Sequence, residues 1–141
     1  MLPAEKPRRP FSVTLLVIVV LIVAVTYLLR LVQALAQWEF LSNWLLVPPL
    51  YLALTGLVWA SAGLSLAGSL WMGKRWARPA FWLAFAAFSL YFWVDRLLLP
   101  GYPQRNANWP FLAGLHLCCL AFSYWVLSRA KAKSYFGAMH E

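Results

Sequence analysis

The sequence predicts an all-α integral membrane protein, a single domain over residues 1–141 that folds as a four-transmembrane-helix bundle. Hydrophobic residues make up 63% of the chain and charged residues only 11%, whereas soluble domains have about 45–50% and about 25%. Four apolar runs are each long enough to cross a bilayer core, which takes roughly 20 helical residues. The Lys and Arg clusters all fall on one side of these runs, as in membrane proteins of fixed orientation.

The predicted spans cover about residues 12–35, 47–72, 80–99 and 110–128. A proline stands at the start of each span, where its missing N–H removes no helical hydrogen bond: Pro10, Pro48, Pro79 and Pro110. The apolar part of the first span exceeds the roughly 7–15 residues of a secretory signal, so we expect it to stay in the protein uncleaved. Residues 38–46, WEFLSNWLL, are predicted to lie as a short helix in the outer interface.

The connections between the spans predict the orientation of the protein. Basic clusters occur in KPRRP before the first span, in GKRWARP between the second and third, and in SRAKAK after the fourth. The first connection has Glu39 and no Lys or Arg, and the third has only Arg105. The positive-inside rule therefore predicts that both termini are cytoplasmic, with the protein in a bacterial-type plasma (inner) membrane.

The formal net charge of +8 does not indicate nucleic-acid binding, because the basic residues form short clusters between apolar runs. The predicted partners are the lipid bilayer and other membrane subunits or copies of the same chain, and no nucleic acid. Tryptophans are expected in two interfacial belts, except Trp59, which lies at mid-depth and is predicted to be a packing residue.

Polar residues of all four spans are predicted to lie at one level near the outer face. At about 1.5 Å per residue, Asp95 and His116 each come roughly 8 Å below the outer edge of the hydrocarbon. The members of this candidate polar layer are Arg30, Gln33, Tyr51, Thr55, Asp95 and His116.

Asp95 is expected to pair with Arg30, because charges at membrane depth are costly and usually have partners or face water. Three interpretations stay open. The pair clamps the first span to the third, or the layer forms a small polar cavity for an ion, a proton or a small ligand, or it contacts a partner subunit.

The second span has a stripe of small residues that predicts close helix packing. Gly56, Ala60, Gly63 and Ala67 recur at spacings of four and three, and such residues let helix backbones approach in lipid. The stripe serves either packing within the bundle or contact with another copy or subunit.

Catalytic chemistry is not indicated. The spans hold only one acidic residue, so no carboxylate pair is available for acid–base catalysis. His116, Cys118 and Cys119 follow too closely on one helix to point at one metal ion, and the adjacent cysteines are expected to be free. One histidine could ligate a haem-type pigment, but alone it gives little support, so no cofactor and no metal are predicted.

The sequence leads us to expect a non-enzymatic small membrane protein, an accessory or scaffold subunit of a complex or a homo-oligomer, joined through the small-residue face of the second span. The alternative is a small homo-oligomeric channel or transporter that uses the polar layer. A membrane enzyme is disfavoured.

Overall fold

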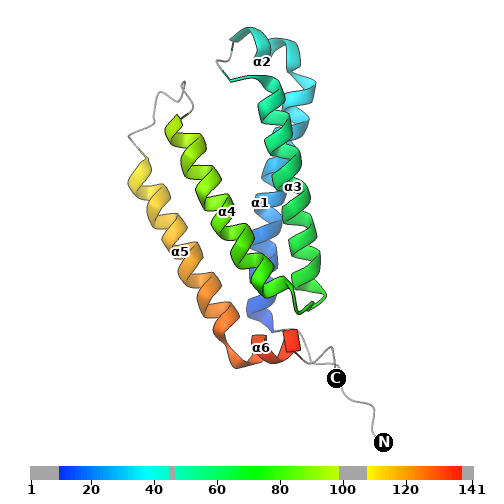
Figure 1. Cartoon of the computed structure of the whole chain (residues 1–141), viewed down its shortest axis with the longest axis vertical. Coiled ribbons are helices and arrows are strands. Elements are labelled where there is room, and N and C mark those ends of the chain that lie inside the picture. The colour runs from blue at the N-terminus through cyan, green and yellow to red at the C-terminus, as the bar shows by residue number, and fades with distance from the viewer. Residues whose placement is uncertain (1–9, 45–46, 99–107, 138–141) are drawn as a thin grey trace, which may run out of the picture.

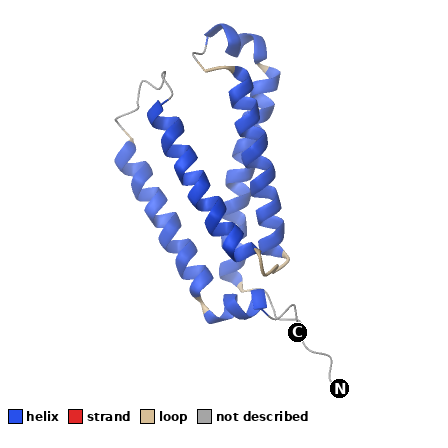
Figure 2. Cartoon of the chain, viewed as in Figure 1, coloured by secondary structure: helices blue, strands red, loops and turns tan. Residues whose placement is uncertain are grey.

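A computed structural model describes residues 10–44, 47–98 and 108–137 of the chain. This part is all-helical, with no β-strand in the described ranges (Figures 1 and 2). The helices are α1 (Phe11–Ala36), α2 (Trp38–Trp44), α3 (Pro49–Trp71), α4 (Ala77–Leu98), α5 (Trp109–Ser128) and α6 (Ala130–Gly137). Helices α1, α3, α4 and α5 are long and apolar enough to cross a membrane, which confirms the prediction of an all-helical protein with four helices of this kind.

The observed helix ends lie close to the predicted ones. Helix α4 begins at Ala77 rather than near Ala80, so Pro79 lies inside its first turn. The first four N–H groups of a helix have no intrahelical partner, so a proline there removes no hydrogen bond. Helix α2 forms in the segment predicted to be helical. Helix α6 was not predicted, because a short basic segment has too few apolar residues for a clear pattern.

Helices α1 and α3 pack side by side along much of their length (Figure 1). A methyl group added to Gly63 would lie 2.8 Å from the Ala24 Cβ, and one added to Gly56 would lie 2.9 Å from the Leu31 backbone nitrogen. Ala60 and Ala67 are also buried. The small-residue stripe of α3 therefore faces α1 within the same chain, and close packing of this kind holds helices together in lipid.

Helices α4 and α5 stand away from the α1–α3 pair toward the end that carries α2 (Figure 1). The buried residues of α4, Ala77 and Phe81, lie in its first two turns, and those of α5 lie in its last two turns. Ala77 and Phe81 of α4 and Val126 and Leu127 of α5 belong to one core with Leu16 and Leu70. We call this the packed end of the bundle and the opposite one the open end.

Helix α6 crosses the packed end and buries Ala132, Tyr135 and Phe136 there. The Tyr135 hydroxyl donates a 2.5 Å hydrogen bond to the Trp71 carbonyl oxygen. Its ring lies 3.0 Å from the place where a Cβ at Gly73 would be, and Gly73 has φ +67°. This turn therefore requires glycine both for its backbone conformation and for space.

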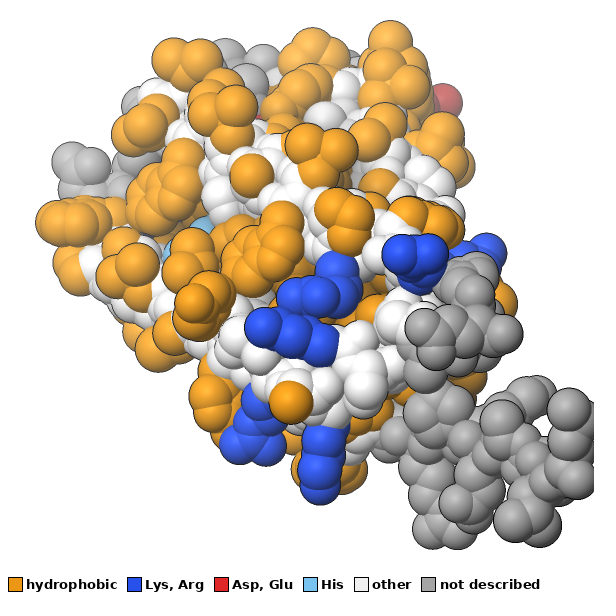
Figure 3. All heavy atoms as spheres, turned by 60° about the horizontal axis from the view of Figure 1, so that its bottom comes forward, with side chains coloured by type: hydrophobic (Ala, Val, Ile, Leu, Met, Phe, Trp, Pro, Cys, Tyr) orange, Lys and Arg blue, Asp and Glu red, His pale blue; other side chains and the backbone are white. Residues whose placement is uncertain are grey.

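The described Lys and Arg side chains gather at the packed end, apart from Arg30 and Arg96 (Figure 3). The basic residues at the packed end are Lys74, Arg75, Arg78, Arg129, Lys131 and Lys133. Arg78 Nη2 donates to the Leu127 carbonyl oxygen at 3.0 Å and so ties α4 to the end of α5. The Arg129 guanidinium lies 3.7 Å from the centre of the Trp125 ring, a cation–π contact.

Candidate functional site

Two hydrogen bonds between tyrosines and charged residues connect α4 to α1 and α3 near the open end. The Tyr51 hydroxyl of α3 donates to Asp95 Oδ1 of α4 at 2.5 Å. Arg30 Nη1 of α1 donates to the Tyr91 hydroxyl of α4 at 3.2 Å. The Arg30 guanidinium also lies 5.8 Å from the centre of the Tyr27 ring. We call these five residues the tyrosine network.

The expected direct pairing of Arg30 with Asp95 is not formed among the described residues, where each charge has a tyrosine as its hydrogen-bond partner. Arg30 and Asp95 lie at similar depths, but Tyr91 lies one turn before Asp95 on the same helix. Tyr27 likewise lies one turn before Arg30. The missed signal was the spacing of three or four residues between each tyrosine and the charged residue that follows it.

The other members of the predicted polar layer lie outside the tyrosine network. Thr55 Oγ1 donates to the Tyr51 carbonyl oxygen of its own helix at 2.8 Å, and Gln33 is exposed. His116 of α5 lies beside Phe88 and Phe92. These two phenylalanines belong to the part of α4 that precedes Asp95. Three helices rather than four therefore supply the network, and α5 contributes to a different site.

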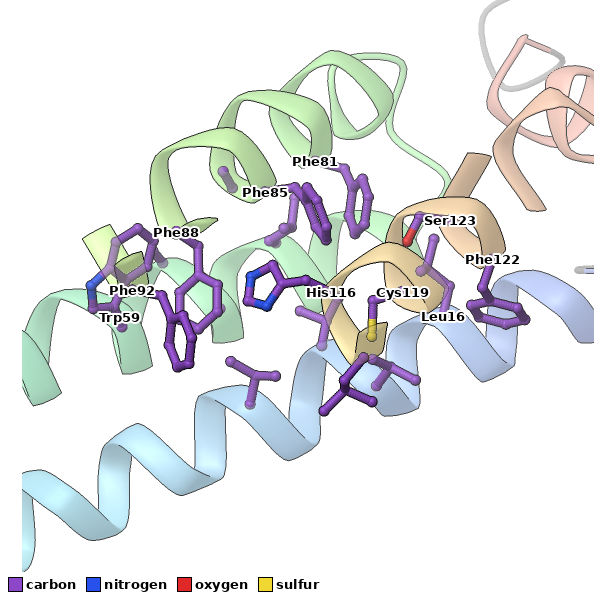
Figure 4. Close-up of a pocket in the computed structure, with 18 of the residues that line it drawn as sticks. Leu16, Trp59, Phe81, Phe85, Phe88, Phe92, His116, Cys119, Phe122 and Ser123 are labelled. Atoms are coloured by element: carbon purple, nitrogen blue, oxygen red, sulfur yellow. The ribbon is translucent and has the colours of Figure 1, made fainter. Parts of the chain in front are cut away.

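That second site is a cavity of about 470 Å³ between the α1–α3 pair and helices α4 and α5 (Figure 4). Leu16, Val20, Trp59 and Leu66 line it from α1 and α3. The divergence of α4 and α5 from the other pair produces this space, because the side chains between them do not fill it. It is mainly apolar, as ligand pockets usually are.

Helix α4 lines the cavity with four phenylalanines that we call the phenylalanine ladder. Phe81, Phe85, Phe88 and Phe92 recur at spacings of four, three and four and therefore share one face of the helix. Phe81 and Phe85 have ring centres 6.0 Å apart, and Phe88 and Phe92 have theirs 6.3 Å apart. This ladder was not predicted, although its helical spacing is visible in the sequence FWLAFAAFSLYF.

Helix α5 faces the ladder with a stripe that includes polar side chains: Leu112, His116, Cys119 and Ser123. The His116 ring reaches among Phe85, Phe88 and Phe92 (Figure 4). Its centre is 5.1 Å from that of Phe92, and its plane is tilted only 9° from that of Phe88. Within the described ranges His116 makes no hydrogen bond. Helix α5 thus directs hydrogen-bonding groups into an apolar space.

A layer of aromatic rings connects the cavity with the tyrosine network. Trp59 and Phe88 line the cavity, and their ring centres are 5.1 Å apart. The same two rings lie 5.3 Å and 6.4 Å from Tyr91 of the network. Trp59, expected to be a packing residue, therefore lies at the contact between the two sites.

The described residues contain no group of three or more potential metal-ligand side chains. Cys118 and Cys119 are free, as expected. Comparisons of the chain with models of known protein families, with curated proteins and with solved structures gave no match.

Proposed function

We propose that this chain is a non-enzymatic multi-pass membrane protein that holds an apolar molecule between its α1–α3 pair and helices α4 and α5. The cavity of about 470 Å³ is the observation that supports this proposal. Its size lies within the roughly 300–1,000 Å³ typical of small-molecule sites. Its walls are aromatic and aliphatic, with a few hydrogen-bonding groups on one side.

The membrane setting that we propose is the plasma (inner) membrane with both termini in the cytoplasm. It is supported by the basic side chains at the packed end (Figure 3) and by the absence of Lys and Arg from the described connection between α1 and α3. In this orientation the packed end faces the cytoplasm. The tyrosine network then lies toward the outer surface, with the cavity below it.

A role as an accessory subunit or homo-oligomer is a second candidate, supported by a different face of α3 from the one predicted. Ser61 and Ser65 are exposed, and a methyl group at Gly68 would have no atom within 4 Å. These residues lie outside the stripe that α1 covers. A channel through the polar layer has less support, because Arg30 and Asp95 bind tyrosines of their own chain.

A binding titration with 1-aminoanthracene, a fluorescent apolar molecule, tests the proposal in mild detergent. Ala84→Phe would fill the cavity from α4, since Ala84 lines it. Ala87→Phe adds the same ring at an exposed position of the same helix and serves as the control. We expect the wild type and Ala87→Phe to bind the probe alike and Ala84→Phe to bind at least tenfold more weakly. Equal binding by all three would contradict the proposal.

A further inference from the structure

Helix α5 directs His116 and Ser123 toward the cavity, beside Leu112 and Leu115, and turns Leu117 and Leu120 away from it. Leu117 and Leu120 are exposed on the surface of the chain, whereas His116 and Ser123 line the cavity. Ser123 is only 3% exposed, and no described residue forms a hydrogen bond with its hydroxyl. Polar side chains inside a membrane protein usually mark a functional path or site. Their position here indicates an occupant that is not purely hydrocarbon.

His116 is the most informative of these groups. A neutral imidazole has one N–H donor and one nitrogen acceptor, and neither has a partner among the described residues. Burying such groups without partners is unfavourable. A hydrocarbon chain would leave both unpaired. A buried water does not fit here either, because it needs two to four polar partners and phenyl rings surround His116.

The rings around His116 favour a flat occupant. Phe88 lies nearly parallel to the imidazole, and Phe92 approaches it at 5.1 Å between ring centres. Aromatic rings prefer offset-stacked or edge-to-face contacts, which a planar ring entering beside His116 would make. Further along the cavity the walls become aliphatic on the α1 and α3 side, at Leu16, Val20 and Leu66, and this part suits a flexible tail.

We propose that the occupant is an apolar molecule with a carbonyl-bearing planar ring and a hydrocarbon tail, the chemistry of isoprenoid quinones. His116 donates its N–H to a ring carbonyl, the phenylalanine ladder stacks on the ring, and the tail lies along α1 and α3. This inference rests on the proposed function and narrows it to one chemical class.

Two ligands that differ in their ring oxygens test this inference. The first is 2,3-dimethoxy-5-methyl-6-decyl-1,4-benzoquinone, whose fully substituted ring leaves no position for a thiol of Cys118 or Cys119 to attack. The second is decylbenzene, which has the tail and a ring but no carbonyl. Titration calorimetry of the full chain in detergent gives both affinities. One hydrogen bond predicts a preference of roughly 2- to 12-fold for the quinone.

Variants at His116 assign that preference to the histidine. His116→Leu should bind the two ligands equally, and His116→Gln, which keeps an N–H donor, should retain much of the preference. A quinone preference that survives in His116→Leu would overturn the assignment. If His116→Leu does not fold, the ratio of the two affinities in the wild type and in His116→Gln still tests the inference.

The outcomes separate this inference from the function on which it rests. Equal affinity of the wild type for both ligands would overturn the quinone-like class while leaving the cavity as an apolar binding site. Failure of the wild type to bind either ligand, together with failure to bind 1-aminoanthracene, would overturn both.

Discussion

The α1–α3 pair and helices α4 and α5 differ in the side chains that they present and in how closely they pack. Helices α1 and α3 pack tightly against each other, whereas α4 and α5 stand away from this pair. Glycine and alanine let α1 and α3 approach so closely that a single added methyl group would clash. Helix α4 instead presents phenylalanines and α5 a histidine, and these two helices leave a cavity in front of the pair. Small side chains thus allow α1 and α3 to pack closely, whereas the large rings of α4 line a cavity between α4 and this pair.

The largest effect is expected when a bulky side chain is added to the face of α3 that packs on α1, and the same change on another face is the control. Gly63→Leu should destabilise the fold by about 1–3 kcal/mol or more, because its Cβ would lie 2.8 Å from that of Ala24. Gly68→Leu meets no atom within 4 Å of its Cβ and should change stability little. Thermal unfolding of the two variants in detergent measures the difference. Equal losses would mean that α1 does not cover the predicted face.

The phenylalanine ladder offers a second test, because it runs from the packed end to the open end. Phe81 is 4% exposed in the core, whereas Phe92 is half-buried beside the cavity. Phe81→Ala should therefore cost about 3 kcal/mol, the lower end of the range for a buried phenylalanine, and Phe92→Ala clearly less. The order of their unfolding midpoints is the readout. A reversed order would place the tight packing at the wrong end.

The tyrosine network should give a somewhat smaller effect. Tyr51→Phe removes a hydrogen bond to a carboxylate, a class worth about 1.5–3 kcal/mol. A double-mutant cycle with Asp95→Asn should show strong coupling, because both changes affect the same contact. Exchanging Arg30 and Asp95 should not restore stability, since these two residues do not contact each other directly. Full rescue by that exchange would favour the direct ion pair instead.

The smallest effect is expected where α6 joins the packed end. Tyr135→Phe keeps the buried ring but loses the hydrogen bond to the Trp71 carbonyl, which should cost about 0.5–1.5 kcal/mol. Tyr124→Phe, at an exposed position of α5, should cost almost nothing. Unfolding curves of the two variants decide. No loss in Tyr135→Phe would mean that α6 does not hold this end together.

The sequence was sufficient for features that depend on one segment at a time. Span lengths, proline positions and the helix of residues 38–44 follow from local composition, and the structure contains them. The partner of Asp95 was not predictable in this way, because it depends on how α3 and α4 are rotated about their axes. The rise of about 1.5 Å per helical residue places Arg30 and Asp95 at similar depths. It does not distinguish a direct contact between them from two contacts with tyrosines.

The cavity was still harder to predict, because it arises from the tilt of α4 and α5 against the other pair. The small side of α3 at Gly63 and the large ring of Phe85 on α4 can be recognised in the sequence. The space between them depends on how the helices pack. His116 shows the same limit. Its depth was estimated, whereas its position among Phe85, Phe88 and Phe92 was not.

Mass spectrometry of the intact protein, released gently from its own membranes, tests the central claim most directly. The account predicts that the wild type and Ala87→Phe each carry one extra small molecule and that the cavity-filled Ala84→Phe carries none. An unoccupied wild type, or the same bound mass in Ala84→Phe, would contradict the claim that this cavity holds the ligand of the protein.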